Sequence, residues 1–188
     1  NIKELVIPAS VKKVEGSAFA YCPNLTKVTF AASNMELIEG CFAGCHKLQS
    51  VTFPASLTRD MTYDMFRDCP MLTTVTLPKN LRTVPQQMFS GCKSLRKIDL
   101  PVTVTKIDGH AFSGCPITDL VITGVTEVDD SSFMGCTSLK TITINKTLRD
   151  KLIDDNYWLY TTNFSNNPSL QLVLKNSQVS LPAGIKVQ

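Results

Sequence analysis

The stretch FAYCPNL, residues 19–25, carries the pattern Phe-x-x-Cys-x-x-Leu, which organises the whole chain. The steps between successive cysteines of this pattern are 23, 24, 23, 23 and 21 residues. A fixed period in this range is typical of a solenoid, in which each repeat forms one coil. The anchor triplets are Phe19/Cys22/Leu25, Phe42/Cys45/Leu48, Phe66/Cys69/Leu72, Phe89/Cys92/Leu95, Phe112/Cys115/Ile117 and Phe133/Cys136/Leu139.

Each anchor leucine is followed by apolar residues three and five positions later, as Leu72 is by Val75 and Leu77. This alternation predicts a short, half-buried strand in every repeat. The other apolar pairs of this kind are Val28/Phe30, Val51/Phe53 and Ile98/Leu100. A proline often follows the strand and ends it, because proline has no N–H for a ladder. A second apolar pair, such as Val104 and Ile107, leads back to the next phenylalanine.

One coil of about 23 residues cannot bury its apolar side alone, so the coils must stack on one another. We expect a parallel sheet along one face, with the phenylalanines, the aliphatic residues and the cysteines in three internal columns. The homogeneous period predicts a single domain over residues 1–188. Within it, regular repeats cover 1–144, an irregular insertion covers 145–163 and a C-terminal capping coil covers 164–188.

The pattern resembles the leucine-rich repeats of the BspA-like type, with the consensus Leu-x-x-Leu-x-Leu-Pro-x-x-Leu-x-x-Ile-x-x-x-Ala-Phe-x-x-Cys. The best matches run from Leu72 to Cys92 and from Leu95 to Cys115. The resemblance implies a right-handed, mainly β solenoid, displayed or secreted by host-associated bacteria and some protozoa. It also implies an extracellular or cell-surface role in adhesion or protein binding, without catalysis, and a partner on a host or neighbouring cell.

The seven cysteines allow either a disulfide framework or a set of buried thiols. Six of them recur at the repeat period, and Cys41 takes the small position that Ala18 fills in the first repeat. Stacked identical side chains point the same way, which does not give the Cβ geometry of a disulfide. A zinc site lacks a Cys-x-x-Cys motif and a neighbouring histidine pair. We therefore predict free, buried thiols with a core role.

The side chains between the core residues of each strand must point to solvent and form a candidate partner-binding face. The face is rich in threonine, which is also simply a good strand residue. Its candidate contact residues are Lys27, Thr29, Thr52, Thr74, Thr76, Lys97, Asp99, Asp119, Thr141 and Thr143.

The regular repeats end after Ile144, and Asn167 stands where the next cysteine is due, 31 residues after Cys136. The segment from residue 145 to 160 is predicted to be partly helical, with Thr147 and Asp150 as an N-cap pair. Its apolar stripe comprises Leu148, Leu152 and Ile153. Three aromatic residues of this insertion either seal the core or offer a platform for a sugar or a partner, namely Tyr157, Trp158 and Tyr160.

Several function classes have no support in the sequence. We find no catalytic constellation, no cofactor motif and no metal-ligand set, so we predict that the protein is not an enzyme. The net charge of +3 is small and its cations are dispersed, which argues against nucleic-acid binding. No apolar run is long enough for membrane insertion, and we expect the chain to begin after any signal peptide. The open alternatives are a protein-binding module, a glycan-binding module and a passive spacer.

Overall fold

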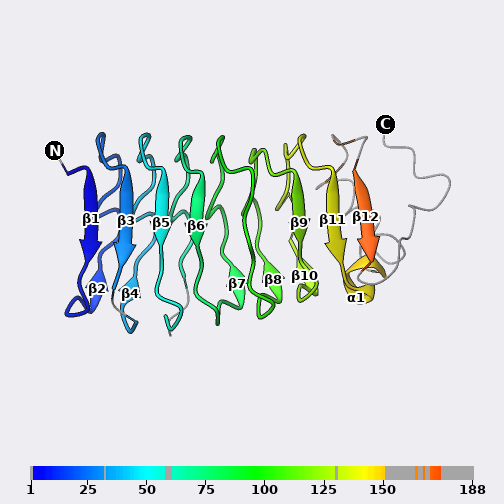
Figure 1. Ribbon diagram of the computed structural model, residues 1–188, viewed down its shortest axis with the longest axis horizontal. Helices are drawn as coiled ribbons and strands as arrows, with labels where there is room; N and C mark the ends of the chain where they lie inside the picture. Colours follow the sequence, from blue (N-terminus) through cyan, green and yellow to red (C-terminus); the bar gives the residue numbers. More distant parts are fainter. Residues whose placement is uncertain are drawn as a thin grey trace.

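The computed structural model describes residues 2–31, 33–57, 61–129, 131–150, 164, 167 and 170–174. These residues form a mainly β solenoid whose coils lie side by side in a nearly straight row (Figure 1). The predicted fold class, a leucine-rich-repeat solenoid with a parallel sheet on one face and very little helix, is confirmed.

One strand from most coils contributes to the main face of the solenoid. The strands β1 (Glu4–Ile7), β3 (Lys27–Phe30), β5 (Ser50–Thr52) and β6 (Thr74–Thr76) form one parallel sheet in that order. The strands β9 (Asp119–Val121), β11 (Thr141–Ile144) and β12 (Gln171–Leu174) form a second parallel sheet further along. Equivalent positions pair directly, as Thr29 with Thr52 and Thr52 with Thr76, so each coil repeats the register of its neighbour.

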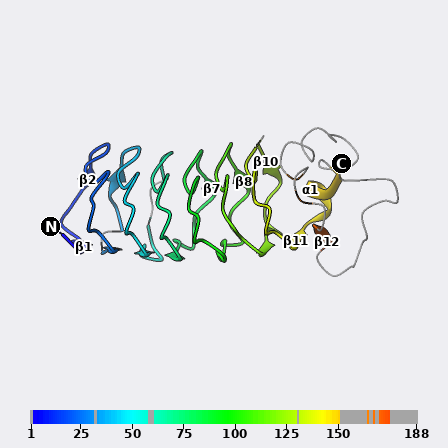
Figure 2. The same ribbon diagram turned by 90° about the horizontal axis from the view of Figure 1, so that it is seen from above.

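The other side of the solenoid carries short strands of two residues each (Figure 2). They are β2 (Lys13–Val14), β4 (Glu36–Leu37), β7 (Thr83–Val84), β8 (Lys106–Ile107) and β10 (Glu127–Val128), and they pair as β2-β4 and β7-β8-β10. Their second residues are buried, including Val84 and Ile107, so the second apolar pair of each repeat is a core position as predicted.

The predicted phenylalanine column runs through the core. Phe42, Phe66, Phe89, Phe112 and Phe133 are fully buried, and consecutive rings are stacked with centroids 5.5 to 5.9 Å apart. Phe19 stacks on Phe42 at 5.4 Å but is only partly buried. Phe164 continues the column with a centroid distance of 5.5 Å to Phe133. The column therefore bridges the irregular insertion.

One predicted strand does not form. Residues 97–100, which contain the expected pair Ile98 and Leu100, are not in a strand, although Ile98 is buried as expected. The main sheet is therefore divided between β6 and β9 (Figure 1). Asp99 offers a physical reason, because aspartate is depleted in strands while β-branched residues favour them.

The C-terminal irregular region differs from prediction at its helix cap. The helix α1 (Lys146–Asp150) begins one residue after Asn145, whose Oδ1 accepts a hydrogen bond from the Leu148 N–H at 2.8 Å. Asn145 is thus the N-cap, and the predicted pair Thr147 and Asp150 is wrong. Leu148 is fully buried as predicted, whereas Leu152 and Ile153 lie outside the described residues.

Candidate functional site

The candidate residues on the repeats lie along the outer face of the main strands and of residues 97–99 between them, which together we call the sheet face. Seven of them are exposed: Lys27, Thr52, Thr74, Thr76, Lys97, Asp99 and Asp119. The other three, Thr29, Thr141 and Thr143, are half-buried. Val6 and Val121 are exposed on the same face by 63% and 60%. The predicted alternation is therefore present, because the residues between them, such as Val28, Val51 and Ile142, are fully buried.

Three threonines form a continuous line across the first sheet. Thr29, Thr52 and Thr76 pair in register on β3, β5 and β6, so neighbouring side chains are roughly 4.8 Å apart. Their hydroxyl groups make no hydrogen bond within the described part of the chain. These hydroxyls are therefore open to water or to a ligand, as both donors and acceptors.

Charged residues lie on the sheet face in pairs of opposite sign. Lys27 lies 4.0 Å from Glu4 on the neighbouring strand, and Lys97 lies 3.4 Å from Asp99. Thr141 donates a hydrogen bond to the carboxylate of Asp119. This bond, and then one from Thr118, lowers the pKa of Asp119. The face is therefore polar and nearly neutral, without a field that would select a strongly charged ligand.

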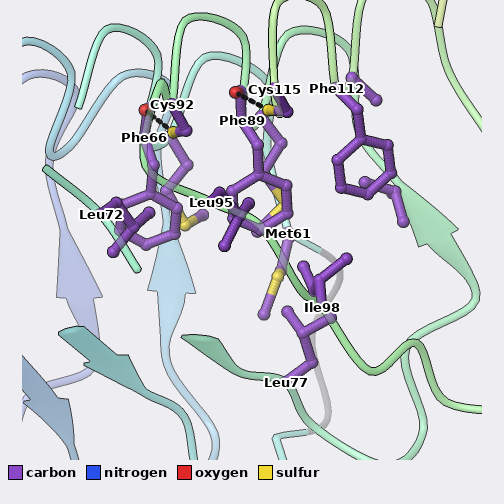
Figure 3. Close-up of a cluster of buried hydrophobic side chains, with 14 of the residues drawn as sticks. Met61, Phe66, Leu72, Leu77, Phe89, Cys92, Leu95, Ile98, Phe112 and Cys115 are labelled. Atoms are coloured by element: carbon purple, nitrogen blue, oxygen red, sulfur yellow. Dashed lines mark hydrogen bonds between the residues drawn. The ribbon is translucent and has the colours of Figure 1, made fainter. Parts of the chain in front are cut away.

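The cysteines have a structural role that their spacing only partly predicted. All seven are free, and six are buried. Each anchor thiol from the second coil onward donates to the phenylalanine carbonyl of the preceding coil, as Cys92 does to Phe66 at 3.3 Å and Cys115 to Phe89 at 3.0 Å (Figure 3). Burial raises the pKa of Cys45 to about 11 and that of Cys92 well above the usual value. These thiols are therefore poor nucleophiles and act as links between coils.

Asn167 replaces the cysteine of the last described coil, as its position in the sequence predicted. Its side chain is buried, and its Nδ2 donates to the carbonyls of Cys136 at 3.1 Å and Leu139 at 2.6 Å. An amide has two donors where a thiol has one weak donor. Asn167 therefore closes the column of coil-to-coil hydrogen bonds with stronger donors than the thiols provide.

Two turn positions per coil adopt positive φ, and glycine recurs at only one of them. The position before the anchor cysteine is Gly44, Gly91, Gly114 or Gly135 in four coils, and its φ lies between 68° and 74°. A Cβ atom on Gly44 would lie only 2.4 Å from the ring of the exposed Tyr21. The second position is filled by Ser17, Gly40, Asp64, Gln87, His110 and Ser131. The residue type at this second position varies from coil to coil, so the sequence alone does not identify it.

The described part of the chain contains no metal site and no membrane-spanning helix. No group of three or more His, Cys, Asp and Glu side chains gathers there in a way that could hold a metal ion. None of the helices described has the length and apolar character needed to cross a membrane. Tyr157, Trp158 and Tyr160, the candidate glycan platform, lie outside the described residues.

Solved structures from bacteria share this fold. A leucine-rich repeat protein of Bacteroides ovatus superposes with a TM-score of 0.78 at 22% identity, over 92% of this chain and 42% of that one. A leucine-rich cell surface protein of Faecalibacterium prausnitzii superposes with a TM-score of 0.57 at 26% identity, over 77% of this chain and 48% of that one. A leucine-rich repeat protein of T. pallidum superposes with a TM-score of 0.60 at 23% identity, over 93% of this chain and 70% of that one. This chain thus spans less than half the length of the first two proteins.

A family model described as the BspA type leucine-rich repeat region matches residues 1–63 and 59–169, with 6 copies of the repeat. No curated protein matches the chain. Repeats of this family are associated with protein interaction or structural support, and their solenoid is typically non-catalytic. Since the family model covers far more than half of the sequence, the chain belongs to the BspA-type leucine-rich repeat family.

Proposed function

We propose that this chain is a non-catalytic interaction module, at the cell surface or outside the cell, that binds a protein partner through its sheet face. The line of free hydroxyls at Thr29, Thr52 and Thr76 carries this proposal. Repeated, outward-facing donors and acceptors on rigid strands offer a partner many hydrogen bonds at little cost in ordering entropy.

The shape and charge of the face agree with a protein ligand. The coils lie in a nearly straight row, so the sheet face is long and extended (Figures 1 and 2). Exposed Val6 and Val121 add apolar contact area among the polar groups. Protein interfaces combine apolar and polar contacts in this way. The cell-surface location draws support from the family and from the F. prausnitzii relative, which is described as a cell surface protein.

A pair of charge substitutions tests the proposal. Thr52→Glu and Thr76→Glu together place two like charges on neighbouring strands, at two of the three positions of the hydroxyl line. The matched control is Gln86→Glu with Thr105→Glu, at two exposed positions beside β7 and β8 on the other side of the solenoid. Both double variants have the same net charge.

The measurement is binding of the labelled protein to arrayed extracellular and cell-surface proteins and to arrayed glycans. We expect a protein ligand whose affinity falls at least about tenfold in the Thr52/Thr76 variant, or roughly 1.4 kcal/mol, and stays unchanged in the control. Equal affinity of both variants would exclude the sheet face as the binding surface. Binding to glycans alone would favour the insertion aromatics, and no binding at all would favour a passive spacer.

A further inference from the structure

The main sheet has a gap between β6 and β9, in a stretch that the structure describes throughout. We call residues 96–101 the Asp99 segment. Its neighbours on either side, β6 and β9, belong to different sheets. In four other coils the residue just before the strand accepts two backbone hydrogen bonds from the next coil, as Thr26 does from Gln49 and Ser50 at 2.8 and 3.2 Å. Among the described residues, the Asp99 segment has one such bond, from Thr118 to Arg96 at 3.2 Å.

Two core residues beside this gap are also less buried than their equivalents in other coils. Six apolar residues in the described core are only partly buried, and four of them, Leu5, Val11, Phe19 and Cys22, belong to the first coil. The other two, Val75 and Leu100, lie in the middle of the array on β6 and in the Asp99 segment. The residues equivalent to Val75 on the neighbouring strands, Val28 and Val51, are fully buried.

The opposite side of the same coils is intact. The strand β8 pairs with both β7 and β10, and Lys106 and Thr105 donate to the Arg82 carbonyl at 3.2 and 2.8 Å. Phe89 stacks on Phe66 at 5.9 Å and on Phe112 at 5.5 Å. The coils are therefore held together along the turns and the short strands but not along the sheet face.

The residue at the centre of the gap differs in kind from its equivalents. Every other described coil has a β-branched residue at this outward position, namely Val6, Thr29, Thr52, Thr76, Val121, Thr143 and Val173. Asp99 occupies it in the Asp99 segment. Aspartate is depleted in strands because its side chain competes for backbone hydrogen bonds.

We propose that the Asp99 segment is a hinge at which the solenoid bends about its intact side, and that Asp99 keeps this hinge open. In a solenoid each coil contacts only its neighbours, so one weak interface divides the array into two rigid blocks. Bending there widens or narrows the sheet face without breaking the phenylalanine column. The hinge exists whether or not the sheet face binds a partner.

Electron paramagnetic distance measurements across the hinge test the proposal. Spin labels at Thr52→Cys and Val121→Cys span three coil steps across the Asp99 segment, and labels at Val6→Cys and Thr76→Cys span three steps within the first sheet. Both pairs are built in a Cys22→Ala background, because Cys22 is the one thiol that is not buried. We expect a broad distance distribution for the first pair and a narrow one for the second. Equally narrow distributions would overturn the hinge.

The variant Asp99→Thr tests the role of Asp99, with Asp99→Val as a second replacement. We expect either variant to narrow the distribution across the hinge and to slow hydrogen exchange of the amides of residues 97–100 at least about tenfold. The amides of β3 and β5 should keep their exchange rates. An unchanged distribution and unchanged exchange in both variants would overturn the role of Asp99. A Thr76→Asp variant should open a second gap, with faster exchange on β5 and β6.

Discussion

Two structures run along this solenoid, the column of stacked phenylalanine rings and the ladder of main-sheet strands, and only the second is interrupted at the Asp99 segment. The stacked phenylalanine rings run without a break from Phe19 to Phe164, whereas the main sheet divides between β6 and β9. The ring column keeps the same residue in every coil, and the sheet column changes from β-branched residues to Asp99 at the division. The comparison shows that each ladder depends on its own column of side chains, and that one column can fail while the other holds.

The largest effect should come from breaking the intact ladder. Phe89→Ala removes a fully buried ring that stacks on two others, and we expect it to lower the free energy of unfolding by about 3–5 kcal/mol. Urea denaturation followed by circular dichroism measures this loss. Phe89→Leu is the control, because it keeps much of the apolar volume and should cost less. A loss below about 1 kcal/mol for Phe89→Ala would mean that the ring column does not carry the core.

The second prediction concerns the end of the thiol column. Asn167→Ala leaves the carbonyls of Cys136 and Leu139 without their side-chain donor, and we expect a loss of about 1–3 kcal/mol in unfolding free energy. Asn167→Cys supplies a thiol that can donate to the Phe133 carbonyl, the equivalent of the acceptor used in the other coils, and should recover part of this loss. Equal stability of Asn167→Ala and the parent protein would show that these bonds do not hold the last coil.

The buried thiols predict a specific pH dependence. Burial raises the pKa of Cys45 to about 11 and that of Cys136 to about 12, so unfolded chains lose these protons at lower pH than folded ones. Below about pH 9, the ordinary thiol pKa, burial of these thiols makes its full contribution to the free energy of unfolding. This contribution falls as the pH rises from there through the pKa values of the folded protein. Each such thiol should add about 1.4 kcal/mol per pH unit to the slope above pH 9.

Urea denaturation at pH 9 to 10.5 tests this slope with Cys92→Ala, whose parent thiol is fully buried. We expect the variant to be less stable at pH 7 but to lose stability less steeply with pH. Cys22→Ala, at a half-buried thiol, is the control for removing a cysteine. An identical slope in Cys92→Ala and the parent protein would mean that the thiol is not protected from solvent.

The smallest effect should come from the outer side of the sheet. Thr76→Ala removes an exposed hydroxyl that makes no hydrogen bond in the described part of the chain, so we expect a change within about 0.5 kcal/mol. The same denaturation assay as for Phe89→Ala gives a direct comparison of the two ladders. A loss at Thr76 comparable to that at Phe89 would mean that the strand register is shifted by one residue.

Residues that recur in every coil were predictable from the sequence. The phenylalanine column and the buried strand positions both follow from one period and simple alternation. The capping role of Asn145 was missed because Thr147 fits the local capping pattern equally well. The deciding contacts, from Asn145 to the Thr123 and Val125 carbonyls at 3.0 and 2.7 Å, cross to the preceding coil.

The missing strand at residues 97–100 was hidden by the same regularity. Ile98 and Leu100 have the right alternation, and the departure lies in the exposed Asp99 between them. Core periodicity carries no information about outward positions, where strand propensity decides. The outward positions of the sheet face were also predictable from the alternation, but their residues vary among threonine, valine and charged types, so no ligand could be predicted from them.

The most direct test of the proposed architecture is alkylation of the seven cysteines in the native protein, followed residue by residue with mass spectrometry. The structure buries six thiols in the core and leaves Cys22 half-buried in the first coil. We predict that iodoacetamide modifies Cys22 first and reaches the other six only when denaturant unfolds the chain. Modification of Cys69, Cys92 or Cys115 in the native protein as fast as Cys22 would contradict a closed core built on the repeat.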